Sequence, residues 1–281
     1  MLGQKVSMEN LKEMAKDIRE KILIMTHNVN SGHPGGSLSL VEIMLSLYFY
    51  KIRYNPKDPN WEDRDRVVIS KGHATPVVYL TLAKAGFFEE EEVMKGFRRL
   101  GYNFQGHVYT GVPGVEFSTG SLGQGLSAGI GMALAARYKN KDYNVYVILG
   151  DGEVQEGSIW EAAMFASFHK INNLCAIIDY NKIQQNGFVN EILSIEPLKD
   201  RWEAFGWNYI EIDGHNFDEI FQALDAFESS KVSGKPTVIV SNTIKGKGIS
   251  FMEYNNAFHG RAPTKEELDR ALQELRGGNH G

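Results

Sequence analysis

Cysteine and long apolar runs are nearly absent from this sequence, and each absence excludes a class of protein. The 281 residues include one cysteine, Cys175, so no disulfide can form within the chain. Because Cys175 stands in the apolar run 173–178, we expect a buried thiol and a cytoplasmic protein. No apolar run approaches the roughly 18 residues that cross a bilayer. The polar, amphipathic first segment is unlike a secretory signal, so we expect no membrane insertion.

Positive charge is also scarce. The chain has 30 Lys and Arg against 35 Asp and Glu, which gives a net charge of −5 and an isoelectric point near 5.9. Nucleic acid calls for a basic face on its protein partner, so we do not expect it as the main ligand. A local basic cluster can still bind a phosphorylated small molecule. The 42% of hydrophobic residues is ordinary for a globular protein and is enough for a large core.

The pattern of apolar residues predicts strands that alternate with helices. Near-continuous apolar runs predict strands at 66–70, 144–149, 174–179, 208–213 and 236–241. Helical spacing predicts helices at 7–29, 40–50, 123–138, 158–170, 217–228 and 264–275, with a glycine-rich turn at 31–37. Ser7 is a plausible N-cap, and Thr264 and Glu267 have the spacing of a capping box. This order indicates an α/β fold with a parallel sheet covered by helices on both faces, which binds ligands at the carboxyl ends of its strands.

Two predicted strand ends carry polar groups suited to one task. The sequence Gly-Asp-Gly at 150–152 follows one strand, and Asp-Tyr-Asn-Lys-Ile at 179–183 closes the next. Because a helix separates the strands, they can be parallel neighbours, and Asp151 and Asn181 would then face one crevice. Carboxylate, amide and main-chain carbonyl oxygens suit Mg²⁺, and the glycines and the next helix N-terminus suit a diphosphate. The simpler alternative is an ordinary turn and a later turn asparagine.

Together the two segments resemble the thiamine-diphosphate signature. The wider text, Gly-Asp-Gly-Glu-Val-Gln-Glu-Gly followed by Asp-Tyr-Asn-Lys-Ile, is similar to that of transketolases, and the resemblance spans residues 9–264. It implies the thiamine-diphosphate-binding fold. It also implies that Asp151, Asn181 and the carbonyl of Ile183 bind Mg²⁺, and that Gly152 contacts the diphosphate.

Four of the eight histidines stand in turns rich in Gly or Pro, which present a side chain at a fixed place. They are His33, His73, His107 and His259. A zinc site is a competing interpretation, but the sequence has no His-Glu-x-x-His and no cysteine pair. For any one of the four, a surface turn residue is the simpler alternative.

The four histidine contexts also resemble transketolase, which implies that they line the funnel to the cofactor. The resemblance implies catalytic roles for His33, His107 and His259, as groups that bind substrate hydroxyls and move protons near neutral pH. It implies cofactor contacts for His73 and His259. The two residues after His107 depart from the family, which usually has a proline and an acidic residue where this chain has Val and Tyr.

The glycine-rich segment 118–125 opens a predicted helix. Its glycines almost spell a dinucleotide-binding fingerprint, but the spacing is wrong and no clear strand precedes them. By resemblance to transketolase, Gly120, Ser121 and Leu122 contact the aminopyrimidine ring, with Ser121 in place of the usual proline.

Four charged side chains complete the candidates. Glu153 and Lys245 are candidate cofactor contacts, and Lys245 could meet a phosphate, although the Lys-Gly-Lys-Gly text there also resembles related synthases. Glu156 and Glu161 have two interpretations. They are solvated carboxylates favoured by a helix dipole, or, by the resemblance, residues of a subunit interface between two active sites.

The resemblance covers only the first part of a single-chain transketolase. It implies that residues 1–281 form one diphosphate-binding domain with an N-terminal helix and a C-terminal helical tail. A partner chain would carry the pyrimidine-binding domain in an α2β2 heterotetramer. The implied reaction transfers a two-carbon ketol (glycolaldehyde) unit from a ketose phosphate to an aldose phosphate with thiamine diphosphate and Mg²⁺. The alternatives are a deoxyxylulose-phosphate-type synthase, the α chain of a 2-oxoacid dehydrogenase and a non-catalytic binding subunit; the four histidines favour sugars over pyruvate.

Overall fold

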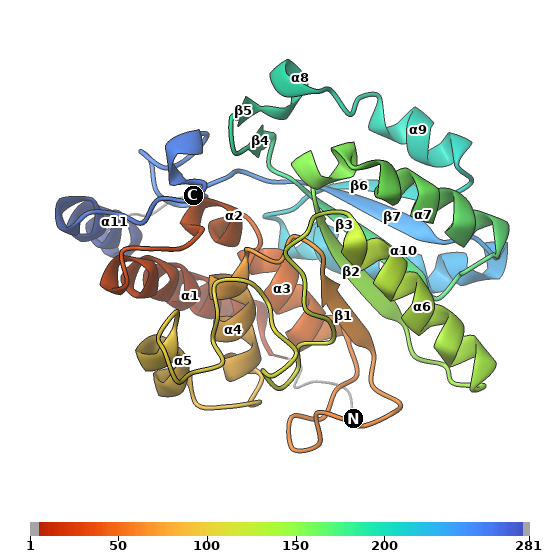
Figure 1. Cartoon of the computed structure of the whole chain (residues 1–281), viewed down its shortest axis with the longest axis horizontal. Coiled ribbons are helices and arrows are strands. Elements are labelled where there is room, and N and C mark those ends of the chain that lie inside the picture. Colours follow the sequence, from red (N-terminus) through yellow and green to blue (C-terminus); the bar gives the residue numbers. More distant parts are fainter. Residues whose placement is uncertain (1–5, 278–281) are drawn as a thin grey trace.

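A parallel five-stranded sheet forms the centre of the molecule (Figure 1). The computed structural model describes residues 6–277. The strand order is β1-β2-β3-β7-β6, and each strand is parallel to its neighbours. The strands are β1 (Arg66–Ile69), β2 (Val145–Gly150), β3 (Leu174–Tyr180), β6 (Asn208–Asp213) and β7 (Thr237–Asn242). All five predicted strands are present within two residues of their expected ends.

Helices cover both faces of the sheet, as the sequence predicts. Strand residues alternate between two cores: Ile148 and Ile177 pack into one, Val147 and Ala176 into the other. On the first face lie α1 (Met8–Asn28), α2 (Pro34–Leu38), α3 (Val41–Ser46), α4 (Thr75–Lys84), α5 (Glu90–Gly96), α10 (Phe217–Ser230) and α11 (Lys265–Gly277). On the second lie α6 (Gln124–Tyr138), α7 (Gly157–Phe168) and α9 (Leu198–Ala204). Cys175 is fully buried on β3, as expected.

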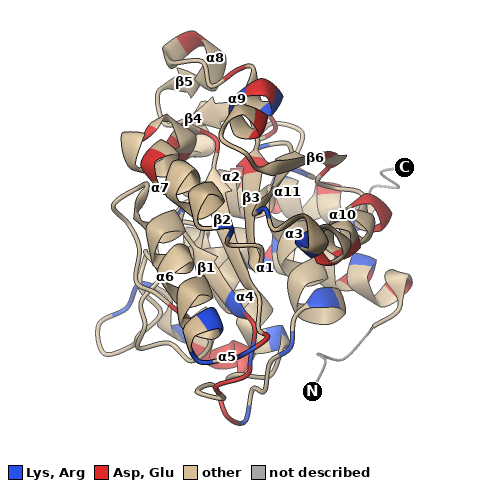
Figure 2. Cartoon of the chain, turned by 90° about the vertical axis from the view of Figure 1, so that its right-hand side faces the viewer, with Lys and Arg blue, Asp and Glu red and all other residues tan. Residues whose placement is uncertain are grey.

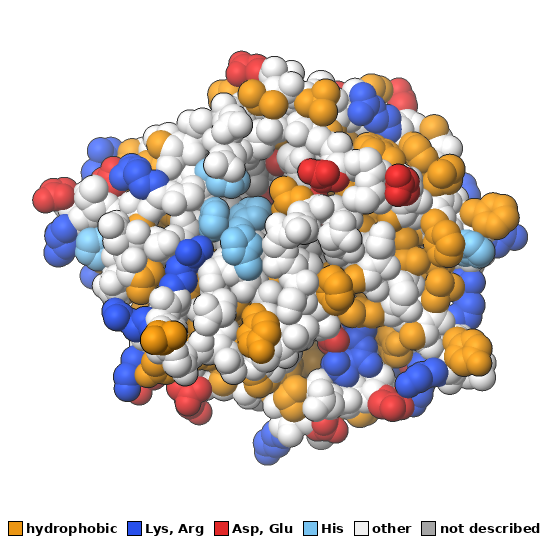
Figure 3. All heavy atoms as spheres, viewed as in Figure 1, with side chains coloured by type: hydrophobic (Ala, Val, Ile, Leu, Met, Phe, Trp, Pro, Cys, Tyr) orange, Lys and Arg blue, Asp and Glu red, His pale blue; other side chains and the backbone are white. Residues whose placement is uncertain are grey.

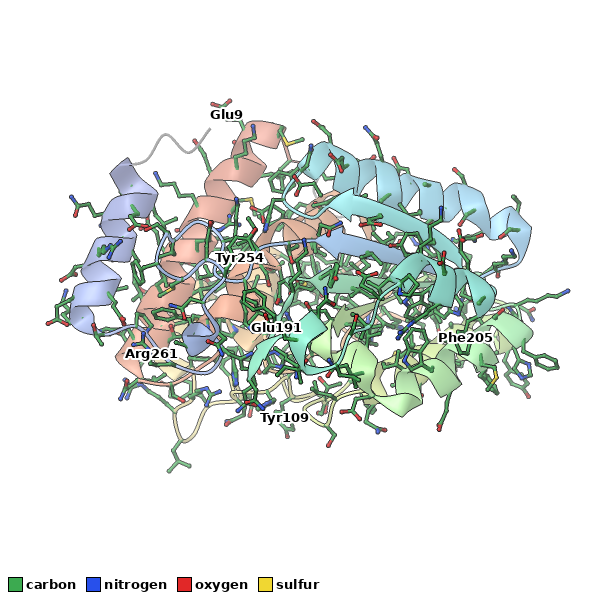
Figure 4. All side chains as sticks on the ribbon, turned by 90° about the horizontal axis from the view of Figure 1, so that it is seen from above. Glu9, Tyr109, Glu191, Phe205, Tyr254 and Arg261 are labelled. Carbon is green, nitrogen blue, oxygen red and sulfur yellow. The ribbon has the colours of Figure 1, made fainter. Side chains whose placement is uncertain are left out.

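Short elements complete the chain. They are the helical turns η1 (Leu47–Lys51), η2 (Gly152–Gln155), η3 (Lys231–Ser233) and η4 (Asn256–Phe258), the antiparallel hairpin of β4 (Ile183–Gln184) and β5 (Gly187–Phe188), and α8 (Val189–Ile192). Seen from above, Glu191 of α8 lies between Arg261 and Phe205 along the length of the molecule (Figure 4). No helix within residues 6–277 is long and apolar enough to cross a membrane.

Helix ends follow the local sequence. The Ser7 side chain accepts a hydrogen bond from the N–H of Asn10 at 3.2 Å and caps α1. Thr264 and Glu267 form the predicted capping box, since the Thr264 N–H donates to the Glu267 carboxylate (2.8 Å) and the Glu267 N–H to the Thr264 hydroxyl (3.2 Å).

The predicted turn at 31–37 is wrong in part, because the short helix α2 begins at Pro34. Proline fits the first position of a helix, where its missing N–H is not needed. Glycine destabilises the interior of a helix, so the two glycines after Pro34 do not favour a helix in the sequence. Here the close packing of Gly35 against Lys245 and Phe258 outweighs that preference.

Candidate active site

The carboxyl ends of β1, β2 and β3 meet at a cavity of about 350 Å³. Nearly all the residues predicted to form a site line it. They are His33, His73, His107, Gly120, Leu122, Asp151, Gly152, Glu153, Asn181, Ile183, Lys245 and His259. Ser121 is exposed and does not line the cavity. Figure 3 shows histidine side chains gathered around a hollow on this face.

Asp151 and Asn181 face the cavity from the turns that follow two neighbouring strands. The Asp151 carboxylate accepts hydrogen bonds from the N–H groups of Gly152 (2.7 Å) and Lys182, and the second bond ties the turn after β2 to the turn after β3. Asp151 and Asn181 are each 3% exposed. Burial and the nearby Asp179 carboxylate raise the pKa of Asp151, so a cation at this place would be stabilising.

The amide of Asn181 is oriented by Asp179. Its Nδ2 atom donates to Oδ2 of Asp179 at 3.0 Å. Its Oδ1 atom therefore lies on the other side, where it accepts the N–H of Ile183 at 3.2 Å. The oxygen end of the amide and the Ile183 backbone are thus held together at one side of the cavity.

Lys71 and Asp179 are functional candidates that the sequence analysis did not identify. Lys71 Nζ and Asp179 Oδ2 are 2.5 Å apart, and both residues are buried. Burial opposes ionisation of Asp179, but Lys71 and hydrogen bonds from Thr243 and Ser39 outweigh it and lower the pKa of the carboxyl. Lys71 lies in the Ser-Lys-Gly-His turn directly after β1 and lines the cavity. The feature of the sequence that could have identified Lys71 is its position directly after a predicted strand.

Lys245 reaches the cavity from the loop after β7. Its Nζ donates to the carbonyl of Ile183 at 2.7 Å and lies 2.7 Å from Nδ1 of His259. Because the ammonium is the donor, Nδ1 of the neutral His259 ring accepts and the ring proton lies on Nε2. Burial and the charge of Lys71 lower the pKa of Lys245. Two cationic side chains on one cavity favour an anionic ligand.

The four predicted histidines form a cluster at the cavity. The centroid of the His33 ring lies 5.0, 5.9 and 5.6 Å from those of His73, His107 and His259. Burial is the main cause that lowers the pKa of His33 to about 4 and that of His259 to about 3. Burial also lowers the pKa values of His73 and His107. Near pH 7 these rings are neutral and can accept a proton.

One ring nitrogen of this cluster lacks an internal partner. His33 Nδ1 is buried and has no hydrogen bond to any residue of the described range 6–277. A buried polar atom without a partner is costly, and such atoms in native proteins call for an explanation. The His33 ring itself lines the cavity, so the unpaired nitrogen belongs to a side chain of the candidate site.

Glu153 lines the cavity, but its carboxylate oxygens accept hydrogen bonds from protein groups. One oxygen accepts from the Ser70 hydroxyl and from the Gly123 N–H (2.8 Å), and the other accepts from the Gly150 N–H (3.0 Å). Glu153 therefore ties the ends of β1 and β2 to the start of α6. This arrangement fixes the turn that carries Gly120 and Leu122.

The β4–β5 hairpin adds lining residues that the sequence analysis did not identify. Gln184 and Asn186 line the cavity, and Gln184 Oε1 accepts a hydrogen bond from Gln155 at 2.7 Å. A Cβ added at Gly152 would lie 3.0 Å from Cβ of Gln184, so the hairpin itself requires a small residue there. Strands of two residues leave no periodicity from which to predict them.

The two glutamates with open interpretations lie in different places. Glu156 is exposed and lines the main cavity. Glu161 is exposed in a separate groove between α6 and α7.

The residues at this cavity fit a diphosphate with a divalent cation. Asp151, Asn181 and Ile183 bring a carboxylate, an amide and a carbonyl to one wall, and these are hard oxygen donors of the kind Mg²⁺ takes. Burial is the main cause of the raised pKa of Asp151, and a cation bound beside the carboxylate would favour its ionised form. Lys71 and Lys245 supply charge that an anion needs.

Comparison with known proteins agrees with this chemistry. Residues 10–279 match the family described as the thiamine diphosphate-binding domain of transketolase. The 6-deoxy-6-sulfo-D-fructose transketolase subunit SqwG of Clostridium sp. (strain MSTE9) is 44% identical over 267 residues, which cover 95% of this chain and 96% of that subunit. One subunit of the apulose-4-phosphate transketolase of Phocaeicola vulgatus is 39% identical, and the match covers 96% of this chain and 95% of that one.

Solved structures give the same family. Transketolase from Campylobacter jejuni superposes with a TM-score of 0.89 at 36% identity, over 96% of this chain and 43% of that one. Human transketolase is 38% identical, and the match covers 42% of its length. The chain thus spans about two fifths of the single-chain transketolases it matches. On this fold, this cavity and these relatives, the chain belongs to the transketolase family and corresponds to its thiamine diphosphate-binding domain.

Proposed function

We propose that this chain is the N-terminal, cofactor-binding subunit of a two-chain transketolase. The enzyme would transfer a two-carbon ketol unit from a ketose phosphate to an aldose phosphate, with thiamine diphosphate and Mg²⁺. The observation that carries the proposal is the convergence of Asp151, Asn181 and Ile183 at a cavity walled by neutral histidines. The Ile183 carbonyl there accepts a hydrogen bond from Lys245. We further propose a cytoplasmic location, since Cys175 is a free, buried thiol.

The cavity residues have separate tasks in this proposal. Asp151, Asn181 and the Ile183 carbonyl would hold Mg²⁺, while Lys245 and Gly152 would meet the diphosphate. When bound, thiamine diphosphate supplies the means to stabilise the carbanion that C–C cleavage leaves. The protein must then take a proton from a substrate hydroxyl as that bond breaks.

His33 and His259 are suited to that proton transfer. Their lowered pKa values keep both rings neutral near pH 7, and a bound anionic cofactor and substrate would raise these values toward those of an effective base. The His33 ring lines the cavity, and its buried Nδ1 has no hydrogen-bond partner within residues 6–277, so the ring can turn toward a ligand hydroxyl without losing an internal hydrogen bond of that atom. We assign His107, at the same cavity, to substrate hydroxyls and His73 to the cofactor.

A partner chain is supported by an exposed apolar surface on α6 and α7. We name it the α6–α7 face and define it by Tyr138, Met164, Phe165 and Phe168, whose side chains are exposed. A groove of about 400 Å³ between the two helices lies beside it. Figure 3 shows hydrophobic side chains gathered on the right of the molecule, where α6 and α7 lie in Figure 1. Apolar patches of this kind are typical of protein interfaces. We propose that the chain carrying the pyrimidine-binding domain binds here in an α2β2 assembly.

The relatives support a sugar substrate. Both subunit-length relatives are named as parts of transketolases, one for 6-deoxy-6-sulfo-D-fructose and one for apulose-4-phosphate. Each name describes a sugar with an anionic group. We therefore propose a sugar phosphate or a similar anionic sugar for this chain, and retain ketol transfer over pyruvate chemistry.

Calorimetry tests the cofactor site. We expect the full chain, mixed with its partner subunit, to bind thiamine diphosphate in the presence of Mg²⁺ and to lose that binding in EDTA. Asp151→Ala should weaken binding by more than about a hundredfold, because it removes the only charged oxygen ligand of the proposed metal site. Asp142→Ala, which removes a surface carboxylate paired with Arg53, is the matched control and should bind as the wild type does.

Two results would contradict the proposal. Equal binding by Asp151→Ala and Asp142→Ala would show that the cofactor lies elsewhere. Turnover of pyruvate without turnover of xylulose 5-phosphate, with the partner subunit present, would replace ketol transfer with a synthase or dehydrogenase reaction.

A further inference from the structure

Two buried side chains and one half-buried one lie behind the loop that carries Lys245. They are Arg19 of α1, Glu42 of α3 and His215, which follows β6. Nη2 of Arg19 lies 2.7 Å from Oε1 of Glu42, and Nδ1 of His215 lies 3.0 Å from Oε2 of the same carboxylate. None of the three lines the cavity, and the proposed reaction gives none of them a task.

This group contacts the loop at two peptide groups. Nε2 of His215 accepts the N–H of Ile244 at 2.9 Å, and Nε of Arg19 donates to the carbonyl of Lys247 at 3.2 Å. Because Nε2 of His215 accepts, the ring proton lies on Nδ1 and donates to Glu42. One carboxylate therefore orients both side chains that hold segment 244–247.

Local backbone geometry explains why His215 lies here. A Cβ added at Gly214 would lie 2.5 Å from Cγ2 of Thr243 and 3.0 Å from Cβ of Ser241. Only glycine allows the turn after β6 to approach the end of β7 this closely. That approach places the next residue, His215, against the N–H of Ile244.

Segment 244–247 is also held from its other side, and this restricts the direction of the Lys245 side chain. The Gly246 N–H donates to the carbonyl of Gly35 at 3.1 Å, and the Lys245 carbonyl accepts from Tyr254 at 3.1 Å. A Cβ at Gly35 would lie 3.2 Å from Cγ of Lys245, so α2 confines the stem of the lysine. The ammonium then reaches the carbonyl of Ile183.

The charges in this group are complementary. Burial opposes ionisation of Glu42, but the Arg19 charge and the hydrogen bond from His215 outweigh it and hold its pKa at about 2. A buried ion pair adds little net stability, because desolvation offsets most of the attraction. The contacts with the loop therefore point to a task other than stability alone.

We propose that Arg19, Glu42 and His215 are positioning residues that hold segment 244–247 so that the Lys245 ammonium reaches the cavity. The identity of the anion that Lys245 meets, a diphosphate, rests on the proposed function. The position of the loop does not, and the two can be tested separately.

Hydrogen–deuterium exchange of the full chain tests the loop. Glu42→Gln removes the negative charge that pairs with Arg19 and places an amide N–H₂ group, a donor, where one carboxylate oxygen accepted, so the hold of residue 42 on the Arg19 and His215 side chains weakens. We expect the peptide that contains 244–247 to exchange at least about tenfold faster than in the wild type. The control is Glu116→Gln, which disrupts a similar buried pair with Arg64 away from this loop. It should leave exchange of 244–247 unchanged. Faster exchange in neither variant, or equally in both, overturns the proposal.

Thiamine diphosphate binding tests the consequence for Lys245. With Mg²⁺ and the partner subunit present, Glu42→Gln should bind about tenfold more weakly, in line with residues that orient a ligand-binding group. In a Lys245→Met background, Glu42→Gln should add no further loss, because the two changes act through one ammonium. Additive losses overturn the proposal.

A second variant and the exchange data distinguish failure of this proposal from misfolding and from failure of the proposed function. If Glu42→Gln does not fold, His215→Ala is used in its place in both experiments. It removes the acceptor for Ile244 and one donor to Glu42 but keeps the Arg19–Glu42 pair. If the wild-type chain binds no thiamine diphosphate, the proposed function fails. The exchange experiment then still decides whether these residues hold the loop.

Discussion

Asn181 owes its orientation to a carboxylate two residues earlier in the chain. Asp179 accepts a hydrogen bond from the amide nitrogen of Asn181 and is itself paired with Lys71. The two ends of an asparagine amide are nearly equal in shape, so without that acceptor either end could face the cavity. The buried ion pair therefore matters less for stability than for the choice of the amide atom that faces the proposed cation site.

His33 makes the stability of the chain sensitive to acid. Its pKa of about 4 lies below the ordinary 6.5, so between these values the unfolded chain binds more protons than the folded one. Stability therefore falls as the pH is lowered from about 6.5 toward 4. The ring is half-buried, and we expect it to account for about 1 kcal/mol of the loss at pH 5. Urea denaturation at pH 7 and pH 5 should show that His33→Gln loses about 1 kcal/mol less than the wild type.

The choice of His33 makes this comparison direct. Its Nδ1 has no hydrogen bond within residues 6–277, so glutamine removes the titrating group without removing an internal bond of that atom. Measuring each protein at both pH values cancels any change in stability that does not depend on pH. Equal losses in the two proteins would show that His33 titrates alike in the folded and unfolded states.

At the scale of single elements, α6 packs on the sheet through its smallest residues. Gly125, Gly129 and Ala133 are buried, and a Cβ at Gly129 would overlap Cγ2 of Val147. The helix has one charged residue, Arg137, and Figure 2 shows the rest of its length without charge. This close approach to the strands places the turn before α6, which carries Gly120 and Leu122, at the cavity.

Two glycines of α6 offer a matched test of this packing. A Cβ at Gly125 would overlap the hydroxyl of Ser70 and lie 2.7 Å from its Cα, so Gly125→Ala should lower the free energy of unfolding by about 2 kcal/mol. A Cβ at Gly131 meets no atom of the described chain within 4 Å, and Gly131→Ala should raise that energy by about 0.5–1 kcal/mol. Thermal denaturation of both variants checks the signs. If both substitutions lowered the free energy of unfolding, helix α6 would not pack on the sheet as described.

The elements that could be predicted are those whose sequence repeats with one period. Buried strands such as β2 and β3 read as apolar runs, and α1 and α10 have an apolar stripe with a capping residue. Helix α4 was not predicted, because nine of its ten residues are buried and it has no polar stripe. A helix buried on all sides carries no helical period in its sequence.

At the scale of the whole molecule, the site was predictable where a strand ended in an unusual residue. Asp151, Asn181 and His73 stand just after β2, β3 and β1, and the parallel order of the sheet brings them to one edge. The other turn histidines reach the same cavity from loops that do not directly follow a strand. Lys71 and Asp179 were missed because a lysine and an aspartate at strand ends are usually solvated. Only the tertiary structure shows that they are buried against each other.

A substitution on the α6–α7 face tests whether a partner chain binds to this surface. Phe165 lines the groove between the helices and is 45% exposed, so a partner that covers it would bury a large aromatic surface. Phe165→Glu should weaken association with the partner subunit by at least about tenfold, because a buried carboxylate without a partner is costly. Sedimentation velocity of the mixed chains measures this association.

Val232→Glu is the control, since Val232 is 95% exposed on η3, outside this face. Val232→Glu should associate as the wild type does, and both variants should keep the same folded stability. If Phe165→Glu also associates normally, the partner binds another surface, and the exposed phenylalanines of α7 have a different explanation.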